Sequence, residues 1–188
     1  VYPGVIKPVD RAGNHGISYC NNEEELLAAY DKAIAVSDKD IVLCERQLCG
    51  KEWVANYVMA NGEARLLYFG RELHERGRDA NLYSILHTTA NGLRQYLEDA
   101  NEKVKTLFKE AGFENGVAWV ETMQDQDGHF YIIEPAYRLG GETFNDFYQK
   151  VRGFNSLRWI IESAMGVQHS IDDLPEALAT ASPHCVGS

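Results

Sequence analysis

The sequence has few basic residues, and this scarcity argues against one large class of function. Its 188 residues contain 18 Lys and Arg against 28 Asp and Glu, which gives a formal net charge of −10. Proteins that bind nucleic acid over a broad surface need a positive field, so we expect no nucleic-acid partner. A local basic pocket for phosphate remains compatible with this balance.

Long apolar runs and paired cysteine motifs are also missing. No stretch approaches the ~18 apolar residues needed to cross a bilayer, and no signal peptide is visible, so we expect no membrane partner. The four cysteines, at positions 20, 44, 49 and 185, show no C-x-x-C or zinc spacing, which favours reduced thiols and a cytoplasmic location. Because the first residues already read as a strand, we expect the chain to be part of a longer enzyme.

The most informative stretch covers residues 116–142, GVAWVETMQDQDGHFYIIEPAYRLGGE. Asp127 and Gly128 lie between two apolar runs and predict a two-residue hairpin turn, because both residues tolerate positive φ. Facing positions around such a turn have a constant sum, so Glu121 is predicted to face Glu134. The neighbouring strand residues are apolar on both faces, which predicts a covered central pair of strands.

Two facing carboxylates oppose strand pairing. Their Cβ atoms are expected about 4.5–5.5 Å apart, and the repulsion at close approach is on the order of 4 kcal/mol at an effective dielectric of about 20. A hard divalent cation such as Mg²⁺, which bridges carboxylate and phosphate oxygens, removes this cost. The residues alone leave two alternatives, an ion pair of one glutamate with Arg138 or a lysine, or a register shifted by one.

A second candidate is the polar loop DRAGNHG at residues 10–16, between strands predicted at 1–8 and 17–20. Gly13 and Gly16 give it a flexible backbone whose N–H groups suit phosphate. It lacks the GKS/T of a Walker P-loop and no helix follows directly, so an ordinary turn is the alternative. Lys7 precedes the loop and can reach phosphate as a point charge, whereas an isolated lysine at a strand end normally faces solvent.

Local signals predict several other elements. Asn22 and Glu25 form a capping box at the start of a helix. The pair Asn61-Gly62 predicts a two-residue hairpin. One apolar stripe predicts a single helix over residues 89–111, with its Glu and Lys residues on a solvated face.

Three motifs in order, KP-x-DRAGNHG-I, CERQLCGKE and VETM…IIEPAYRLGG, resemble the ATP-grasp superfamily over residues 3–141. That group includes D-alanine–D-alanine ligase, biotin carboxylase and the large subunit of carbamoyl phosphate synthetase. The resemblance implies an α+β fold in which two lobes with mainly antiparallel sheets clamp ATP. The implied boundaries are a small lobe at 1–46, a large lobe at 47–168 and a loosely ordered tail at 169–188.

The resemblance also implies roles for single residues. Glu121 and Glu134 would be the carboxylates that hold Mg²⁺ or Mn²⁺, and Arg138 would lie near the γ-phosphate and the reacting acyl group. Lys7 and Arg138 would act in catalysis. The implied nucleotide contacts are Lys7, Asp10, Gly13, Asn14, His15, Gly16, Glu45, the backbone of Arg46 and Leu48 for adenine, and Glu52 for the ribose.

The implied activity is that of an ADP-forming ligase that joins a small carboxylate to an amine or thiol through an acyl phosphate. Many members of the superfamily carry Asn two residues after the second metal Glu, where this chain has Ala136. A nucleotide-binding module without turnover is therefore the alternative, and a purely structural acidic domain is a third reading. Further substrate contacts are expected from other domains of the same chain, with the predicted surface loop at 70–82 as a local candidate.

Overall fold

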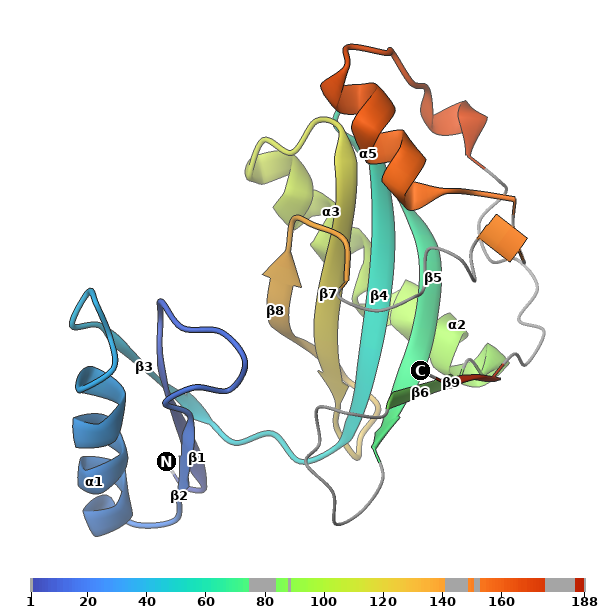
Figure 1. Cartoon of the computed structure of the whole chain (residues 1–188). Helices are drawn as coiled ribbons and strands as arrows, with labels where there is room; N and C mark the ends of the chain where they lie inside the picture. Colours follow the sequence, from blue (N-terminus) through green and yellow to red (C-terminus); the bar gives the residue numbers. More distant parts are fainter. Residues whose placement is uncertain are drawn as a thin grey trace. The chain divides into compact units, whose positions relative to one another are not determined.

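The chain forms two antiparallel sheets, one in each of its two units, Val1–Leu48 and Cys49–Ser188 (Figure 1). The computed structural model describes residues 2–74, 84–87, 89–140, 149–150, 153–174 and 185–187. Every helix within these residues is too short or too polar to cross a membrane.

In the first unit, β1 (Gly4–Pro8) lies between β2 (Ser18–Cys20) and β3 (Val42–Arg46), and α1 (Glu23–Ile34) packs on one face. β1 begins later than the predicted strand at 1–8, since Pro3 has no N–H to donate to a ladder. The small core contains Ile6, Cys20, Ala29 and Ala33.

The start of α1 confirms the predicted cap, with one difference. The Asn22 side chain accepts a hydrogen bond from the N–H of Glu25 at 2.9 Å. The carboxylate of Glu25 accepts the N–H of Asn21 at 2.8 Å, one residue earlier than in the predicted capping box. The helix therefore begins where the sequence predicts it.

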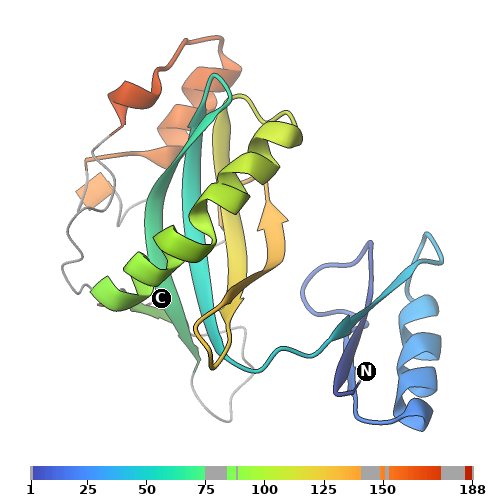
Figure 2. The ribbon, with the colours of Figure 1, turned by 180° about the vertical axis from the view of Figure 1, so that it is seen from behind.

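In the second unit, six strands form one antiparallel sheet in the order β8-β7-β4-β5-β6-β9. Helices α2 and α3 cover one face and α5 the other (Figures 1 and 2). The elements are β4 (Lys51–Ala60), β5 (Glu63–His74), β6 (Ser84–His87), α2 (Ala90–Asp99), α3 (Asn101–Glu110), β7 (Gly116–Gln124), β8 (Phe130–Ala136), α5 (Ser156–Ala164), η1 (Ile171–Asp173) and β9 (Cys185–Gly187).

The turn between β4 and β5 confirms one prediction, and the end of β5 corrects another. Asn61 and Gly62 have φ values of 51° and 79° and join strands whose last pair is Ala60 with Glu63. β5 continues to His74, so the first five residues of the loop predicted at 70–82 are strand, paired with β4 or β6. The rest of that predicted loop lies outside the described residues, as does most of the tail at 169–188 between η1 and β9.

Aromatic stacking fills the core between the sheet and helices α2 and α3. Phe69 stacks on Trp53 with ring centroids 4.9 Å apart and on Tyr96 at 4.3 Å. A second core, on the face covered by α5, contains Val54, Val58 and Trp159. The sheet is thus buried on both faces around β4.

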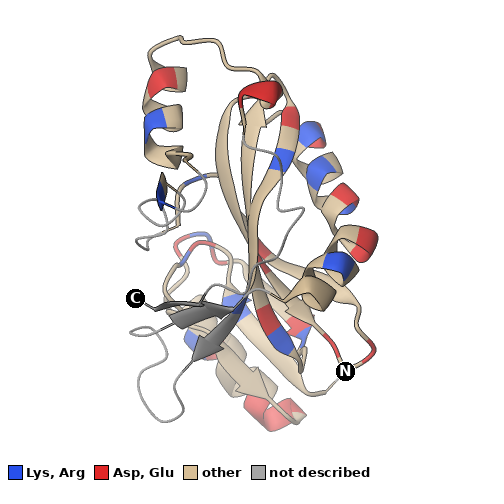
Figure 3. Ribbon diagram, turned by 90° about the vertical axis from the view of Figure 1, so that its right-hand side faces the viewer, with Lys and Arg blue, Asp and Glu red and all other residues tan. Residues whose placement is uncertain are grey.

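The single helix predicted at 89–111 is wrong, because the helix breaks at Ala100 (φ −119°, ψ −30°). On either side of the break, the side chains of Asp99 and Asn101 accept hydrogen bonds from residues far away in the sequence. Asp99 accepts the N–H of Phe130 at 2.6 Å, and Asn101 accepts the hydroxyl of Tyr57 at 2.9 Å. The predicted charged face is confirmed: acidic and basic residues both lie along α2 and α3 (Figure 3), with ion pairs such as Lys103–Asp99 at 3.0 Å.

The hairpin of β7 and β8 contains two departures from prediction that compensate each other. Residues 125–129 join the strands, in place of a two-residue turn. The carboxylate of Asp125 accepts the N–H groups of Asp127 and His129 at 3.0 and 2.9 Å, and Gly128 has φ 92°, as in a type I turn followed by a left-handed residue. A bulge next to Glu121 then restores the register, so Glu121 faces Glu134 as predicted.

The prediction of a covered central strand pair is wrong for β8. β7 lies inside the sheet, between β4 and β8, but β8 is an edge strand of the described sheet. Ile132 and Ile133 on β8 are 38% and 37% exposed. The apolar run that suggested a covered strand therefore lies at the sheet edge.

Candidate functional site

The carboxylate pair is the centre of the candidate site in the second unit. Glu121 faces Glu134 on β8 and Val54 on β4, so both glutamates lie on the sheet face that carries Val54 and the second core. Glu121 is half-buried and Glu134 is exposed. Glu52 faces Met123 two residues along β7, which puts Glu52 on the same face.

The carboxylate oxygens of this pair suit a hard cation whose remaining ligands come from other groups. Within the described residues, no group of three or more His, Cys, Asp and Glu side chains is placed to hold a metal ion. Glu121 and Glu134 supply carboxylate oxygens from two adjacent strands. Mg²⁺ is usually held by one or two carboxylates together with phosphate oxygens and water, so the pair suits this ion when phosphate is bound.

Two residues along the strands from the glutamates, Asn56, Trp119 and Ala136 are paired across three adjacent strands. The amide nitrogen of Asn56 is buried and has no hydrogen-bond partner among the residues that the structure describes, so it is a candidate donor to a bound group. Sequence reasoning did not single out Asn56 or Trp119. Their spacing of two residues from Val54 and Glu121 was the available signal, because strand positions two apart share a face.

Arg138 lies just after β8 and is held by an aromatic ring. Its guanidinium carbon lies 5.5 Å from the centre of the Trp119 ring, and its Nη1 donates to the carbonyl of Leu139 at 2.8 Å. Among the described residues, Arg138 makes no ion pair with Glu121 or Glu134.

In the first unit, the predicted residues Lys7 and Glu45 form an ion pair, with Nζ and Oε2 2.6 Å apart. Glu45 faces Val5 and Lys7 faces Leu43, so both lie on the sheet face opposite Ile6 and α1. Arg46 pairs with Gly4 at the end of β3, and Leu48 is the last residue of this unit.

The same open face carries exposed apolar side chains. Tyr19, which faces Val5 on β1, is 64% exposed, and Leu43, which faces Lys7, is 41% exposed. Exposed apolar side chains beside a charged pair suit a ligand that combines a planar ring with a polar group.

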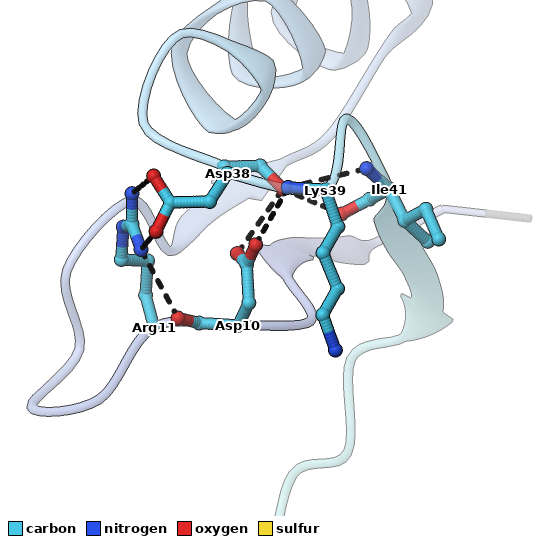
Figure 4. Close-up of polar contacts among 6 residues, drawn as sticks. Asp10, Arg11, Asp38, Lys39 and Ile41 are labelled. Carbon is cyan, nitrogen blue, oxygen red and sulfur yellow. Dashed lines mark hydrogen bonds and ion pairs between the residues drawn. The ribbon is translucent and has the colours of Figure 1, made fainter.

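The predicted phosphate loop has an exposed tip, and hydrogen bonds attach its first residues to the turn before β3. Residues 12–15 are exposed, and Gly13 and Asn14 at the tip have φ values of 63° and 61°. At the base, the carboxylate of Asp10 accepts the N–H of Lys39 at 2.8 Å and the hydroxyl of Ser37 at 3.1 Å (Figure 4). The tip therefore offers its backbone, whereas the Asp10 carboxylate holds the loop to the turn before β3.

A bidentate ion pair fastens the loop at the next residue. Arg11 donates to both oxygens of Asp38, at 2.7 and 2.6 Å (Figure 4). Desolvation raises the pKa of Asp10, but the N–H of Lys39, the hydroxyl of Ser37 and further donors outweigh it and bring the pKa below its usual 3.8. The hydrogen bonds from Arg11 likewise lower the pKa of Asp38.

These pKa directions predict an acid-sensitive loop. Because the folded pKa lies below the unfolded one, the stabilisation is fully present above about pH 4 and is lost as the pH falls through the lower folded value. We expect Asp38→Asn to lower the thermal midpoint at pH 7, and the difference from wild type to shrink as the pH falls from 4 to about 2. Asp31→Asn, at an exposed position of α1, is the control. A difference that stays constant with pH would contradict this role of the ion pair.

Two glycines of the loop differ in what surrounds them. A Cβ at Gly16, which has φ 86°, would lie 2.7 Å from Cγ2 of Val36, whereas a Cβ at Gly13, with φ 63°, meets nothing within 4 Å. We expect Gly13→Ala to cost about 1 kcal/mol for its left-handed backbone alone. Gly16→Ala should cost about 2–3 kcal/mol, because a steric overlap is added. Urea unfolding measures both, and equal costs would show that the overlap relaxes freely.

Comparisons with known proteins agree with this architecture. Residues 1–146 match the ATP-grasp domain family. The chain is 28% identical over 151 residues to dapdiamide A synthase of Enterobacter agglomerans, covering 74% of the chain and 34% of that protein. It is 31% identical over 136 residues to D-alanine–D-alanine ligase of Saccharophagus degradans, covering 70% of the chain and 41% of that protein.

A solved structure extends the comparison to three dimensions. The biotin carboxylase domain of the Hydrogenobacter thermophilus 2-oxoglutarate carboxylase, solved with MgADP and bicarbonate, superposes with a TM-score of 0.73 at 25% identity, over 93% of this chain and 39% of that one. The chain thus spans well under half the length of each of these proteins. On the match over residues 1–146, the chain belongs to the ATP-grasp family and has the ATP-grasp α+β fold.

Proposed function

We propose that the chain is the ATP- and Mg²⁺-binding core of an ADP-forming ligase that joins a carboxylate to an amine or a thiol, with carbon–nitrogen bond formation favoured. The observation that carries this proposal is the facing pair Glu121–Glu134, on one sheet face of a chain that belongs to the ATP-grasp family. In this reaction the γ-phosphoryl group of ATP passes to the carboxylate. The nucleophile then attacks the acyl phosphate, and phosphate leaves.

Each proposed residue has a distinct task in the second unit. Glu121 and Glu134 would hold Mg²⁺ or Mn²⁺, which neutralises charge on the transferring phosphoryl group. Arg138 would orient the γ-phosphoryl and the acceptor carboxylate through its planar N–H donors. Glu52 would accept hydrogen bonds from the ribose hydroxyls, and it lies on the same sheet face as the metal pair.

The first unit would supply the remaining nucleotide contacts. Lys7 would donate to a phosphate oxygen once it leaves Glu45, and the exposed backbone at residues 12–15 would cover the phosphates and exclude water. The backbone of Arg46 and Leu48 would bind adenine. Exposed Tyr19 and Leu43 on the open sheet face support a planar base there.

The names of related proteins support the same class of reaction. The similar biotin carboxylase domain was solved with MgADP and bicarbonate, and two relatives are named as a synthase and a ligase. We propose that the acceptor is a small carboxylate and that other domains of the same chain complete its site. A cytoplasmic location stays a prediction.

The test is a calorimetric titration of the chain with a non-hydrolysable ATP analogue, with and without Mg²⁺. We expect saturable binding that weakens about tenfold or more without the metal, because Mg²⁺ links the two carboxylates to the phosphates. Absence of binding at millimolar analogue, repeated with a longer chain that includes neighbouring domains, would overturn the proposal.

A module that binds nucleotide without turnover is the second candidate, and Ala136 favours it because the usual Asn is a further metal ligand in many members. Release of phosphate from ATP in the presence of a panel of small carboxylates separates the two functions. Turnover with any acceptor supports the ligase. Tight Mg²⁺-dependent binding of the analogue without phosphate release from a longer chain supports the module.

A further inference from the structure

We propose that Trp119 is a positioning residue that sets the guanidinium of Arg138 for an anionic acceptor, and that Ala136 is small because the indole occupies the space beside it. The proposal rests on the proposed function, since it concerns how Arg138 would meet the γ-phosphoryl and the acceptor carboxylate. It is carried by four observations around the indole ring.

The indole is fixed by its place in the sheet. Trp119 lies on β7, which is next to the edge strand β8; it is half-buried and packs against the second core cluster. Its direct neighbours on the adjacent strands are Asn56 and Ala136. A large ring next to a methyl group on the facing strand leaves little room for a longer side chain at position 136.

In the turn after β8, the neighbouring side chains of Tyr137 and Arg138 contact different aromatic rings. Tyr137 stacks on Phe113 with ring centroids 4.2 Å apart, and its hydroxyl donates to the carbonyl of Asn115. The N–H of Arg138 donates back to the carbonyl of Ala136 at 2.9 Å, which tightens the chain around Tyr137. With Tyr137 anchored there, the Arg138 side chain lies over Trp119.

The same ring also supports the residues that follow. Leu139 packs against the second core cluster beside Trp119, and a Cβ placed on Gly140 would lie 4.0 Å from Cδ1 of the indole. Trp119 therefore lies next to Arg138 and Gly140 and shares a core cluster with Leu139, so it borders the segment that carries the guanidinium. Its removal would loosen the segment and the cation together.

The stacking orients the guanidinium as well as holding it. Arginine has five N–H donors in one plane, and within the described residues a single one of these donors has a protein acceptor, the carbonyl of Leu139. A ring beneath one face limits rotation of that plane and leaves its edge for a bidentate anion. Trp119 precedes Glu121 by two residues, so the backbone positions of the indole and of the carboxylate pair are about 7 Å apart along β7. A carboxylate or phosphoryl group is the ligand class that fits such a fork.

The first measurement needs no nucleotide. In an NMR spectrum of the ¹⁵N-labelled chain, ring current from Trp119 should shift the side-chain Nε–H and δ-proton resonances of Arg138. The shift should disappear in Trp119→Leu and persist in Trp119→Phe, which keeps an aromatic ring. Arg138 resonances at ordinary positions in the wild-type chain would overturn the proposal.

The second measurement separates positioning from general damage. With Mg²⁺ present, the ratio of the dissociation constant for ADP to that for the non-hydrolysable ATP analogue isolates contacts to the γ-phosphate. We expect Trp119→Leu to lower this ratio about fivefold, Trp119→Phe to change it less than twofold, and the Arg138→Lys and Trp119→Leu changes to be non-additive. A loss of affinity that is equal for both nucleotides would overturn the proposal, because a purely structural role weakens both alike.

Ala136→Asn tests whether the indole of Trp119 requires a small side chain at position 136, with Trp119 and Arg138 both retained. It introduces the residue found in many relatives at this position, yet we expect it to displace the indole, remove the Arg138 ring-current shift and lower the nucleotide ratio as Trp119→Leu does. An unchanged ratio or a higher one would overturn the link between Ala136 and Trp119. Failure of the wild-type chain to bind any nucleotide would remove the proposed function and this role together, whereas binding with a ratio insensitive to Trp119 would remove this role alone.

Discussion

Replacement of Glu134 by Gln should remove most of the dependence of nucleotide binding on Mg²⁺. Glu134 faces Glu121 directly, so the substitution leaves one carboxylate where two were available to share a cation. Changes to groups that merely support a ligand cost about 10–100-fold in metal affinity, so the loss of a ligand should cost at least about tenfold. Calorimetric titration of the ATP analogue at several Mg²⁺ concentrations measures the change.

Although the same substitution should weaken metal-dependent binding, it should not lower the stability of the fold when no metal is present. Facing carboxylates repel each other, and Glu134→Gln relieves that repulsion. We therefore expect the thermal midpoint of Glu134→Gln in EDTA to equal or exceed that of wild type.

Glu110→Gln provides the matched control for this pair of measurements. Glu110 is the last residue of α3 and is exposed, so its substitution makes the same change of net charge away from the carboxylate pair. It should alter neither the Mg²⁺ dependence nor the midpoint in EDTA by a comparable amount. If Glu134→Gln behaves as this control does, the pair has a structural role only.

Replacement of Lys7 by Gln should weaken binding of the ATP analogue about tenfold to a hundredfold, the value of a hydrogen bond to a charged group. In the structure Lys7 is already directed by Glu45, with its side chain 22% exposed and the two charged atoms 2.6 Å apart. The pair itself should add little to stability, because a partly exposed ion pair contributes about 0–1 kcal/mol.

Glu45→Gln is the matched comparison, since it breaks the same ion pair but leaves the lysine charge in place. If Lys7 binds phosphate, this variant should retain the affinity of wild type or exceed it, because the competing carboxylate is gone. Equal losses in Lys7→Gln and Glu45→Gln would mean that the ion pair, and not the free lysine, matters for the site.

Local features were predictable because each depends on residues close together in the chain. The Asn22 cap of α1 and the Asn61-Gly62 turn are set by the conformational preferences of a few adjacent residues. The ATP-grasp resemblance came from motifs whose order the chain keeps, and the family match confirms it. The facing of Glu121 and Glu134 was predicted correctly, although the predicted turn and the unforeseen bulge were two departures that cancelled.

The features that the sequence did not reveal all depend on distant partners. On either side of the break at Ala100, Asp99 and Asn101 accept hydrogen bonds from Phe130 and Tyr57, and neither contact is visible from helical periodicity. β8 reads as a covered strand because its residues are apolar, yet an edge position depends on which strands are present beside it. Neither fact is encoded within the segment itself.

The candidate site divides in the same way. The sequence by itself determined which residue types are present for the chemistry: the glutamates of the hairpin, Lys7, Arg138 and the glycine loop. The tertiary structure alone decided their surroundings, joining Lys7 to Glu45, Asp10 to the turn before β3, and Arg138 to the ring of Trp119. The physical reason is that residue identity fixes charge and hydrogen-bonding capacity, whereas orientation depends on strand pairing between segments that are far apart in the chain.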